Sequence, residues 1–245
     1  MIELKNVSKE YKIPRGRLKF SDFYALNNIS TIFKNNIVNG ITGSSGSGKT
    51  TLANVITGYD TDYSGEIFYN GKKEKNPKFI RYVFQDPYIA MNPVKNVEWH
   101  IKTAASINGI NMEKATEKLE LAGMDYNNYK NRYANSLSGG ELQKLAFAIS
   151  IIPEPDFIVL DEAFSMMDSI TLFQTLNFLK ELKNKISIIY IDHDINRVSF
   201  VSDYFYIIDH GQIIEEGYTE KIMECPENDY TKELIKYSPD YKKRI

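Results

Sequence analysis

The sequence is short of cysteine, of net charge and of long apolar runs. The one cysteine among 245 residues, Cys225, can form neither an intramolecular disulfide nor a metal cluster by itself, which fits a reducing, cytosolic setting. The formal net charge of −2 gives no reason to expect nucleic acid or an anionic lipid surface as a partner. Because no run of about 18 or more apolar residues occurs, the chain is not expected to span a membrane by itself. Residues 1–11 alternate apolar and polar side chains, so no signal peptide is expected there.

Short apolar runs alternate with helical patterns along the chain. Strands are predicted at residues 2–7, 25–33, 35–42, 64–72, 80–84, 156–160 and 186–191, with a hairpin at 203–217. Turns are predicted at Asn70–Gly71 and His210–Gly211. Helices are predicted at residues 51–58, with Gly58 as a C-terminal cap, and along the leucine stripe at 172–182. Since strands alternate with helices, we expect an α/β fold with a mainly parallel sheet.

Two segments differ from this alternation. The basic stretch at residues 12–23, which contains Pro and Gly, predicts a loop. Residues 87–136 have helical spacing and good helix formers, which predicts a mostly helical insertion. The apolar residues that follow, from Leu142 to Ile149, keep the i, i+3, i+4, i+7 spacing and predict another helix.

The most specific motif is a phosphate-binding loop, GSSGSGKTT, at residues 43–51. It satisfies the pattern G-x-x-x-x-G-K-[ST] and lies between a predicted strand and a predicted helix, as the motif requires. Its glycines let successive N–H groups point at phosphate oxygens, while Lys49 reaches the β- and γ-phosphates and the Thr50 hydroxyl can ligate Mg²⁺. The loop therefore predicts a nucleotide site.

Two acids end the predicted strand FIVLDE at residues 157–162. Asp161 is placed to hold Mg²⁺ through its water shell, and Glu162 to orient and polarise the water that attacks the γ-phosphate. A strand that ends in two solvated acids is common, so the phosphate loop upstream is what favours the catalytic interpretation.

His193 and Gln85 follow two further predicted strands. Ligands of parallel α/β sheets bind at the carboxyl ends of the strands, so His193 is expected to hydrogen-bond the γ-phosphate or the water. The Gln85 amide can touch both Mg²⁺ and the attacking water, and at the joint with the helical insertion it can act as a hinge. His100 and His210 lie in helical and turn contexts and are predicted to be structural.

A second anion-binding pattern lies in SLSGGELQK, residues 136–144. Ser138 and Glu141 form S-x-x-E, a capping box that any helix can use. Ser138 and the N–H groups of Gly139 and Gly140, with the helix N-terminus behind them, also form an anion site. Both interpretations stay open, because the same atoms can serve both.

In this order and spacing, GSSGSGKTT, VFQDP, LSGGELQK, FIVLDE, SMMD and IDHD resemble the nucleotide-binding domain of ABC ATPases over nearly the whole chain. The resemblance implies a single α/β domain over residues 1–245, with a RecA-like P-loop NTPase core, a mainly parallel sheet and an antiparallel β subdomain. It implies a core at 1–86 and 137–218, an inserted α-helical subdomain at about 87–136 and a C-terminal extension at about 219–245.

The resemblance also implies roles for the motifs. They are the Walker A loop at 43–51, the Q-loop at Gln85, the ABC signature at 137–141, Walker B at 157–162, the D-loop at 165–168 and the switch histidine His193. Two such domains of the family dimerise head to tail, so that the signature of one faces the γ-phosphate held by the other. ATP is then expected to contact Gly43, Ser44, Ser45, Gly46, Ser47, Gly48, Lys49, Thr50 and Thr51 of one chain, and Ser138, Gly139, Gly140 and Glu141 of the other. The expected catalytic residues are Lys49, Gln85, Glu162 and His193, and the expected Mg²⁺ ligands are Thr50, Gln85 and Asp161. Tyr11 matches the aromatic residue that stacks on adenine, with Phe23 or Tyr24 as alternatives.

Two stretches of the sequence indicate which group within this family the chain resembles. YKIPRGRLKFSDFYALNNIS resembles the long first loop of ATPases from oligopeptide, dipeptide and nickel importers, and PENDYTKELIKYSPD is similar to their segment after the last core helix. The chain departs from the pattern at DEAFSMMD, where Pro-Thr-Ser-Ala-Leu-Asp usually follows the acids, and at Ile149, where Arg is common. Many members carry a cysteine cluster near the C-terminus. Cys225 alone cannot form one, which implies the cluster-free ATPase of a hetero-pair.

The implied function is an ATP-hydrolysing subunit at the cytoplasmic face of the cell membrane that drives uptake of a peptide, nickel or a metal chelate. The implied partners are integral-membrane permease subunits, a second ABC ATPase in a homo- or heterodimer and, indirectly, an extracytoplasmic substrate-binding protein, with no nucleic acid. Because Lys49, Asp161, Glu162 and His193 are all present, we expect a hydrolytically competent site. Two alternatives stay open: a soluble ABC ATPase such as an Fe–S assembly ATPase, and the ATPase of an exporter or lipid-extraction system.

Overall fold

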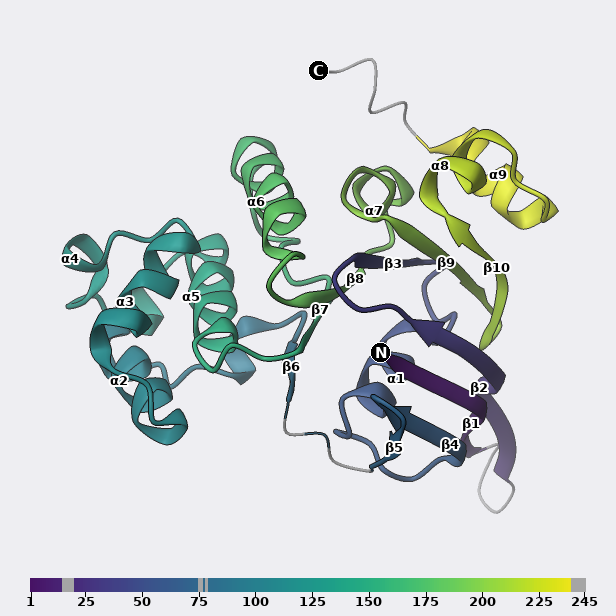
Figure 1. Cartoon of the computed structure of the whole chain (residues 1–245), viewed down its shortest axis with the longest axis horizontal. Coiled ribbons are helices and arrows are strands. Elements are labelled where there is room, and N and C mark those ends of the chain that lie inside the picture. Colours follow the sequence, from purple (N-terminus) through teal and green to yellow (C-terminus); the bar gives the residue numbers. More distant parts are fainter. Residues whose placement is uncertain (15–19, 75–76, 78, 239–245) are drawn as a thin grey trace.

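Two β-sheets with helices around them make up the protein (Figure 1). The structure, a computed structural model, describes residues 1–14, 20–74, 77 and 79–238. The larger sheet has the strand order β10-β9-β3-β8-β7-β6, and its strands pair in parallel except for β9 with β10. These strands are β3 (Val38–Thr42), β6 (Ile80–Val83), β7 (Phe157–Asp161), β8 (Ser187–Ile191), β9 (Tyr204–Asp209) and β10 (Gln212–Tyr218). The predicted mainly parallel sheet is confirmed.

The strands β7 and β8 are mostly apolar because both faces of the sheet are covered. On β7, Ile158 and Leu160 belong to one buried cluster, whereas Phe157 and Val159 belong to the other. Successive side chains of a strand point to opposite faces, so a strand covered on both sides needs apolar residues at every position. This explains the continuous apolar runs of the sequence.

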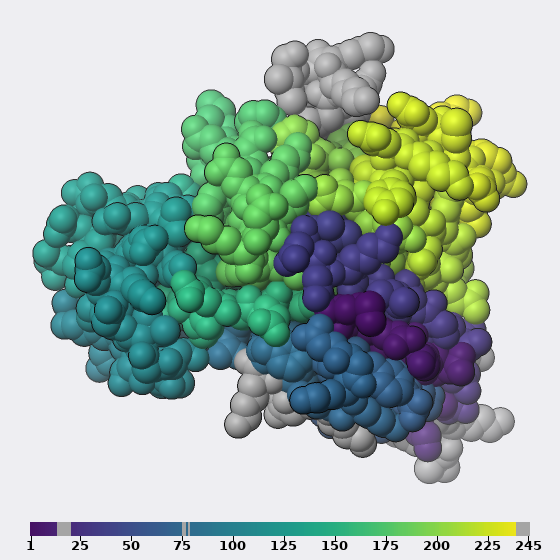
Figure 2. All heavy atoms as spheres, in the orientation of Figure 1, coloured from purple at the N-terminus to yellow at the C-terminus, as the bar shows by residue number. Residues whose placement is uncertain are grey.

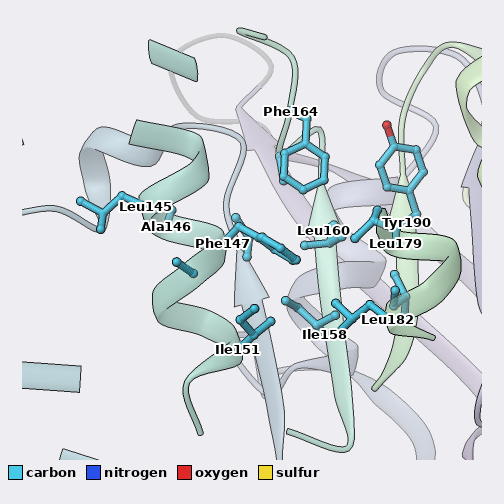
Figure 3. Close-up of a cluster of buried hydrophobic side chains, with 14 of the residues drawn as sticks. Leu145, Ala146, Phe147, Ile151, Ile158, Leu160, Phe164, Leu179, Leu182 and Tyr190 are labelled. Carbon is cyan, nitrogen blue, oxygen red and sulfur yellow. The ribbon is translucent and has the colours of Figure 1, made fainter. Parts of the chain in front are cut away.

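Three helices cover one face of the sheet: α5 (Gly139–Ile151), α6 (Ser169–Leu182) and α7 (Ile195–Val201). In Figure 3, Phe147 of α5 lies between this helix and Leu160 of β7, with Leu179 of α6 on the far side. The Phe147 ring meets that of Phe164 edge to face, with ring centroids 5.6 Å apart. The predicted leucine stripe of α6 is buried as expected.

The other face is covered by α1 (Lys49–Ile56) and by the smaller sheet, whose strand order is β2-β1-β4-β5. Its strands are β1 (Ile2–Pro14), β2 (Phe20–Phe33), β4 (Ser64–Tyr69) and β5 (Lys72–Lys73), all antiparallel to their neighbours. Asn70 and Gly71 connect β4 to β5 with φ of 49° and 79°, as a two-residue hairpin turn of type I′ requires.

The loop predicted at residues 12–23 is wrong for its described part. β1 and β2 remain paired up to Pro14 opposite Phe20, so this stretch is a long hairpin. Tyr11 pairs with Phe23 and Ile13 with Ser21, which continues the antiparallel ladder. Proline, which has no N–H to donate, is tolerated at the last residue of the strand. Residues 15–19 lie outside the described residues.

The helical spacing in residues 87–136 is confirmed by five short elements. They are η1 (Pro87–Ile89), α2 (Val97–Asn108), α3 (Met112–Leu121), α4 (Tyr126–Tyr129) and η2 (Ala134–Ser136). The side chains of Asn96, Asn111 and Asp125 cap α2, α3 and α4 by accepting backbone N–H groups of the first turn. Figure 2 shows these elements as the teal lobe at the left of the molecule.

After the hairpin of β9 and β10, which turns at His210 and Gly211 as predicted, the chain forms α8 (Thr219–Glu224) and α9 (Asp229–Tyr237). Both helices lie beside β10 (Figure 1). Of the C-terminal extension predicted over about 219–245, residues 239–245 lie outside the described residues. Among the helices of the described residues, none has the length and apolar character needed to cross a bilayer.

Candidate functional site

The carboxyl ends of four adjacent parallel strands bring the predicted site residues together. β3 leads into the phosphate loop, β8 leads to His193, and β6 leads to Gln85. β7 ends at Asp161, and Glu162 follows it directly. These strands lie in the order β3-β8-β7-β6, so motifs that are far apart in the sequence meet at one edge of the sheet.

The phosphate loop needs glycine at two positions. Gly43 has a φ of 155°, and a Cβ there would lie 2.0 Å from the carbonyl oxygen of Ile208. Gly48 has a φ of 108°, and a Cβ there would lie 2.3 Å from the carbonyl oxygen of Ala25. Both positions combine positive φ with close backbone contact, so only glycine fits. The loop is thereby packed against β9 and β2.

Lys49 lies under this loop and is almost fully buried. Its Nζ donates to the carbonyl oxygens of Gly43 at 2.9 Å and Ser44 at 2.8 Å. Burial lowers the pKa of Lys49, and the neighbouring carboxylates, of which that of Glu162 acts most strongly, partly offset this effect. Two of the three N–H donors of the ammonium thus point at loop carbonyls, which fixes its position.

Asp161 is 2% exposed and accepts a hydrogen bond from the Tyr82 hydroxyl at 3.0 Å. Burial raises its pKa, and hydrogen bonds from the Thr50 and Tyr82 hydroxyls oppose that rise. The Thr50 hydroxyl and the Asp161 carboxylate are therefore neighbours, and both are the hard oxygen donors that Mg²⁺ prefers. A cation beside them would favour the ionised carboxylate, so these residues fit a magnesium ion.

Glu162 connects the other predicted catalytic residues. Gln85 Nε2 donates to Glu162 Oε2 at 2.8 Å, and His193 Nδ1 lies 3.3 Å from Glu162 Oε1. The Glu162 side chain is 20% exposed, whereas that of His193 is 61% exposed. Three residues predicted from three separate motifs thus form one hydrogen-bonded cluster, which we call the Glu162 cluster.

The signature residues form a capping box at the start of α5. Glu141 N donates to Ser138 Oγ at 3.3 Å, and Ser138 N donates to Glu141 Oε2 at 2.8 Å. Arg132 Nη1 and the Tyr129 hydroxyl also donate to this carboxylate, at 2.8 and 2.9 Å. Burial raises the pKa of Glu141, but the hydrogen bonds, led by that of Arg132, outweigh it and lower the pKa to about 2. The carboxylate is thus held by its own chain, whereas Ser138 is exposed.

The segment predicted as the D-loop, Ser165–Met166–Met167–Asp168, packs against these predicted signature residues. A Cβ on Gly139 would lie 2.6 Å from Met166 Sδ, so the methionine fills the space beside the glycine. The fully buried Gln143 accepts a hydrogen bond from Met166 N at 3.0 Å and donates to Ser165 Oγ at 3.3 Å. Sequence reasoning missed Gln143, although a glutamine among the apolar positions of α5 is a signal for such a buried polar contact.

Tyr11 and Phe23 face each other across the β1–β2 ladder, while Tyr24 pairs with Glu10. Opposite residues of an antiparallel pair share a face, so Tyr11 and Phe23 lie on one face of the hairpin and Tyr24 on the other. All three rings are between 39% and 51% exposed, as an aromatic platform for a ligand has to be.

The two remaining histidines lie outside the site. His100 is buried, accepts Asn92 N at Nε2 and contacts the Asn96 carbonyl through Nδ1, and burial lowers its pKa. It is a neutral core histidine with both nitrogens hydrogen-bonded. His210 is exposed in the β9–β10 turn, with a φ of 44°.

Replacing Arg132 by Met tests the ion pair behind the signature. Because the pKa of Glu141 is lowered from 4.5 to about 2, the pair stabilises the fold above pH 4.5 and loses its effect as the pH falls toward 2. With the Arg132 side chain 38% exposed and screened by solvent, the variant should lose on the order of 1 kcal/mol of unfolding free energy near neutral pH. Urea unfolding at several pH values should show the difference from wild type shrinking below pH 4.5. Lys72→Met, which removes an exposed charge that forms no ion pair with the described residues, is the control, and a pH-independent difference for Arg132→Met would contradict the assignment.

Comparison with known proteins relates this geometry to a family. The family model described as ABC transporter matches residues 26–165, more than half of the chain. The oligopeptide transport ATP-binding protein OppF of Bacillus subtilis is 28% identical over 265 residues, which cover 99% of this chain and 85% of OppF. The dipeptide transport ATP-binding protein DppF of Haemophilus influenzae is 30% identical, over 95% of this chain and 76% of DppF.

Solved structures of ABC cassettes have a similar fold. A dimeric post-hydrolysis state of the ATP-binding cassette MJ0796 bound to ADP and Pi is similar with a TM-score of 0.78 at 25% identity, over 89% of this chain and 99% of that one. A second dimeric MJ0796 structure, described as a bacterial ABC transporter cassette, gives a TM-score of 0.77 at 27% identity over the same shares. The predicted RecA-like P-loop core with an antiparallel β subdomain and inserted helices is confirmed. The chain therefore belongs to the ABC transporter family of ATPases.

Proposed function

We propose that the chain is the ATP-hydrolysing subunit of an ABC importer, bound peripherally at the cytoplasmic face of the membrane and driving uptake through permease subunits. The Glu162 cluster beside the phosphate loop is the observation that carries the hydrolytic role. Peptides are favoured as cargo over nickel or a metal chelate, because OppF and DppF are named for oligopeptide and dipeptide transport.

Hydrolysis follows from the positions of the side chains. The loop N–H groups and Lys49 bind the phosphates, and Lys49 also balances the negative charge that develops on them. Mg²⁺, held by Thr50, Asp161 and the Gln85 amide oxygen, would supply charge neutralisation at the β- and γ-phosphates. The Glu162 carboxylate accepts a proton from the attacking water. Gln85 and His193 keep that carboxylate oriented from two sides.

Glu162→Gln should abolish turnover while preserving nucleotide binding. The amide has nearly the shape of the carboxylate but cannot take a proton from water, so hydrolysis should fall by at least about 100-fold. ATP should then hold the protein in a stable dimer. Phosphate release and size-exclusion chromatography with ATP measure the two effects. Glu154→Gln, which changes an exposed acid paired with Lys118, is the matched control. Undiminished turnover in Glu162→Gln would remove Glu162 from the role of base.

The signature residues are available for a partner chain. Ser138 is exposed at the N-terminus of the 13-residue helix α5, where backbone N–H groups and the helix dipole favour an anion. Within the described residues, no hydrogen bond connects Ser138 with the phosphate loop of its own chain. The capping box and the anion site are therefore compatible. Because Glu141 is held by Arg132, we assign the contact with ATP in the partner to Ser138 and the two glycines first.

Ser138→Arg should preserve ATP binding but prevent two chains from closing into a dimer. The long side chain would block the approach of a second chain, so ATP binding at the local phosphate loop should persist while ATP-dependent dimerisation and hydrolysis are lost. Equilibrium binding of ATP and chromatography of the ATP-bound Glu162→Gln background measure the two. Asn128→Arg on α4, an exposed position in the helical lobe, is the control for the added charge. Loss of ATP binding in Ser138→Arg would favour a purely structural cap.

A groove beside the Q-loop fits a docking site for a permease. It has a volume of about 340 Å³ and lies between the residues after β6 and the helices α2 and α5. Ala90, Met91, Ala104 and Ile149 contribute apolar surface to its lining. Ile149, which replaces the common Arg of the family pattern, thus faces an apolar groove.

Exposed apolar side chains occur in and next to the segments that line this groove. Ile107 lines it and is 78% exposed. Tyr88 and Ile89, which lie in sequence between the lining residues Pro87 and Ala90, are 55% and 73% exposed. Exposed apolar side chains near a groove are typical of a protein interface. Asp86 lines the same groove and follows Gln85 directly, so an occupant would contact the segment that holds the Glu162 cluster.

Ala90→Arg should uncouple the subunit from a permease without disturbing hydrolysis. Ala90 is exposed and lines the groove, so the arginine can be accommodated by the fold but would occupy the docking site. Co-expression with the multispanning proteins encoded beside its gene, followed by membrane extraction and co-purification, measures the association. Asn128→Arg is again the control. Equal co-purification of both variants would contradict docking at this groove. Isolation of the wild type with soluble scaffold proteins would instead favour the Fe–S assembly alternative.

A further inference from the structure

The segment after the last strand reaches back to the phosphate loop. Ser44 N donates a hydrogen bond of 2.9 Å to the hydroxyl of Tyr230, the second residue of α9, across 186 positions of sequence. We propose that Tyr230 is a positioning residue for ATP binding, which acts from outside the loop by orienting the peptide that holds Lys49.

The Gly43–Ser44 peptide is held from both sides. It is trans, and the carbonyl and N–H of a trans peptide point in opposite directions. On one side the Gly43 carbonyl accepts Lys49 Nζ at 2.9 Å, and on the other side Ser44 N donates to Tyr230. Rotation of this peptide would break both hydrogen bonds together. The position of the ammonium is therefore coupled to the tyrosine hydroxyl.

The backbone itself leaves this peptide weakly fixed. Gly43, with a φ of 155°, has no Cβ to restrict its rotation. A loop that needs glycine for close packing therefore needs another group to select one orientation of the following peptide. The Tyr230 hydroxyl is placed to do so.

Tyr230 is itself held rigidly at the start of α9. Asn228 Oδ1 accepts Tyr230 N at 2.9 Å and caps the helix. The carboxylate of Glu215, in β10, accepts Glu227 N at 2.8 Å and Asn228 N at 3.2 Å. The edge of the large sheet therefore fixes the end of the helix from which the tyrosine reaches the loop.

The rest of α9 packs toward the switch histidine. Leu234, Ile235 and Tyr230 are partly buried and pack against the same hydrophobic cluster, which anchors the helix by its apolar face. At its far end, the Ser238 hydroxyl accepts a hydrogen bond from the Asn196 amide of α7. A groove of about 490 Å³ separates this end of α9 from His193. The helix thus contacts the phosphate loop through Tyr230 and lines a groove together with His193.

Tyr230→Phe isolates the hydroxyl, because the ring can stay in place. Loss of the acceptor frees the Ser44 N–H and lets the peptide rotate away from Lys49. The dissociation constant for ATP should therefore rise on the order of 5-fold, the size expected for one hydrogen bond. Once ATP is bound, its phosphates hold the Lys49 ammonium in place, and Glu162, Gln85 and His193 are untouched, so turnover at saturating ATP should stay unchanged. KM should thus rise without a change in kcat.

The measurements use the full chain. Calorimetry gives the affinity for ATP, and hydrogen exchange of residues 43–46 in the nucleotide-free protein should be faster in the variant. Tyr218→Phe is the matched control, because Tyr218 is 66% exposed and its hydroxyl makes no hydrogen bond to the described residues. The melting temperature without nucleotide should match that of wild type.

Two results would overturn the assignment. One is equal ATP affinity in wild type and Tyr230→Phe. The other is weaker binding with unchanged exchange of residues 43–46 and a lowered melting temperature, which would show that the tyrosine only stabilises α9. The inference rests on the proposed ATP site but not on a permease or a peptide. Failure of the wild type to bind ATP would contradict the proposed function, whereas equal binding by both proteins would contradict only the role of Tyr230.

Discussion

The parallel pairing of β3, β8, β7 and β6 is the constraint on which the site depends. Each pair is fixed in register, with Val38 opposite Ile188 and Phe157 opposite Ser187. A slip by one residue would move the side chains of a strand to the wrong face, and these strands are buried on both faces. The register therefore also fixes where each strand ends, and hence where the phosphate loop, the Walker B acids, Gln85 and His193 lie relative to each other.

A second constraint is the close packing of three segments around the backbone of Ala25. Its carbonyl lies where a Cβ on Gly48 or on Gly211 would have to go, at 2.3 and 2.8 Å. Gly211 also donates its N–H to Ser47 and accepts the N–H of Asn27. The phosphate loop, the antiparallel sheet and the β9–β10 turn therefore meet through backbone atoms at this point. The close approach explains why these turns contain glycine, and it packs the Gly48 end of the phosphate loop against the antiparallel sheet.

The sequence predicts local patterns well, and long-range contacts only where a family pattern supplies them. The strand positions and the leucine stripe of α6 follow from periodicity over a few residues. The turns at Asn70–Gly71 and His210–Gly211 follow from local turn chemistry. The hairpin between β1 and β2 was missed, because Pro and Gly punctuation suggested a loop while the ladder continues to Pro14. Tyr230 and Gln143 carry no pattern that points to their partners. Their hydrogen bonds join segments whose proximity is set by the packing of α9 and α5 on the sheet.

Two separate chains of contacts connect the site to the rest of the molecule. One passes through Gln85 and the other through Tyr230. Gln85 joins Glu162 to the groove beside α2 and α5, so the γ-phosphate side of the site is linked to the proposed permease surface. Tyr230 joins the Lys49 peptide to α9 and through it to the edge strand β10. The first chain of contacts ends in the proposed catalytic carboxylate, and the second ends in the group proposed to hold the phosphates. Disturbing the first should therefore change coupling and turnover, whereas disturbing the second should change affinity, because the two share no hydrogen bond in the described part of the chain.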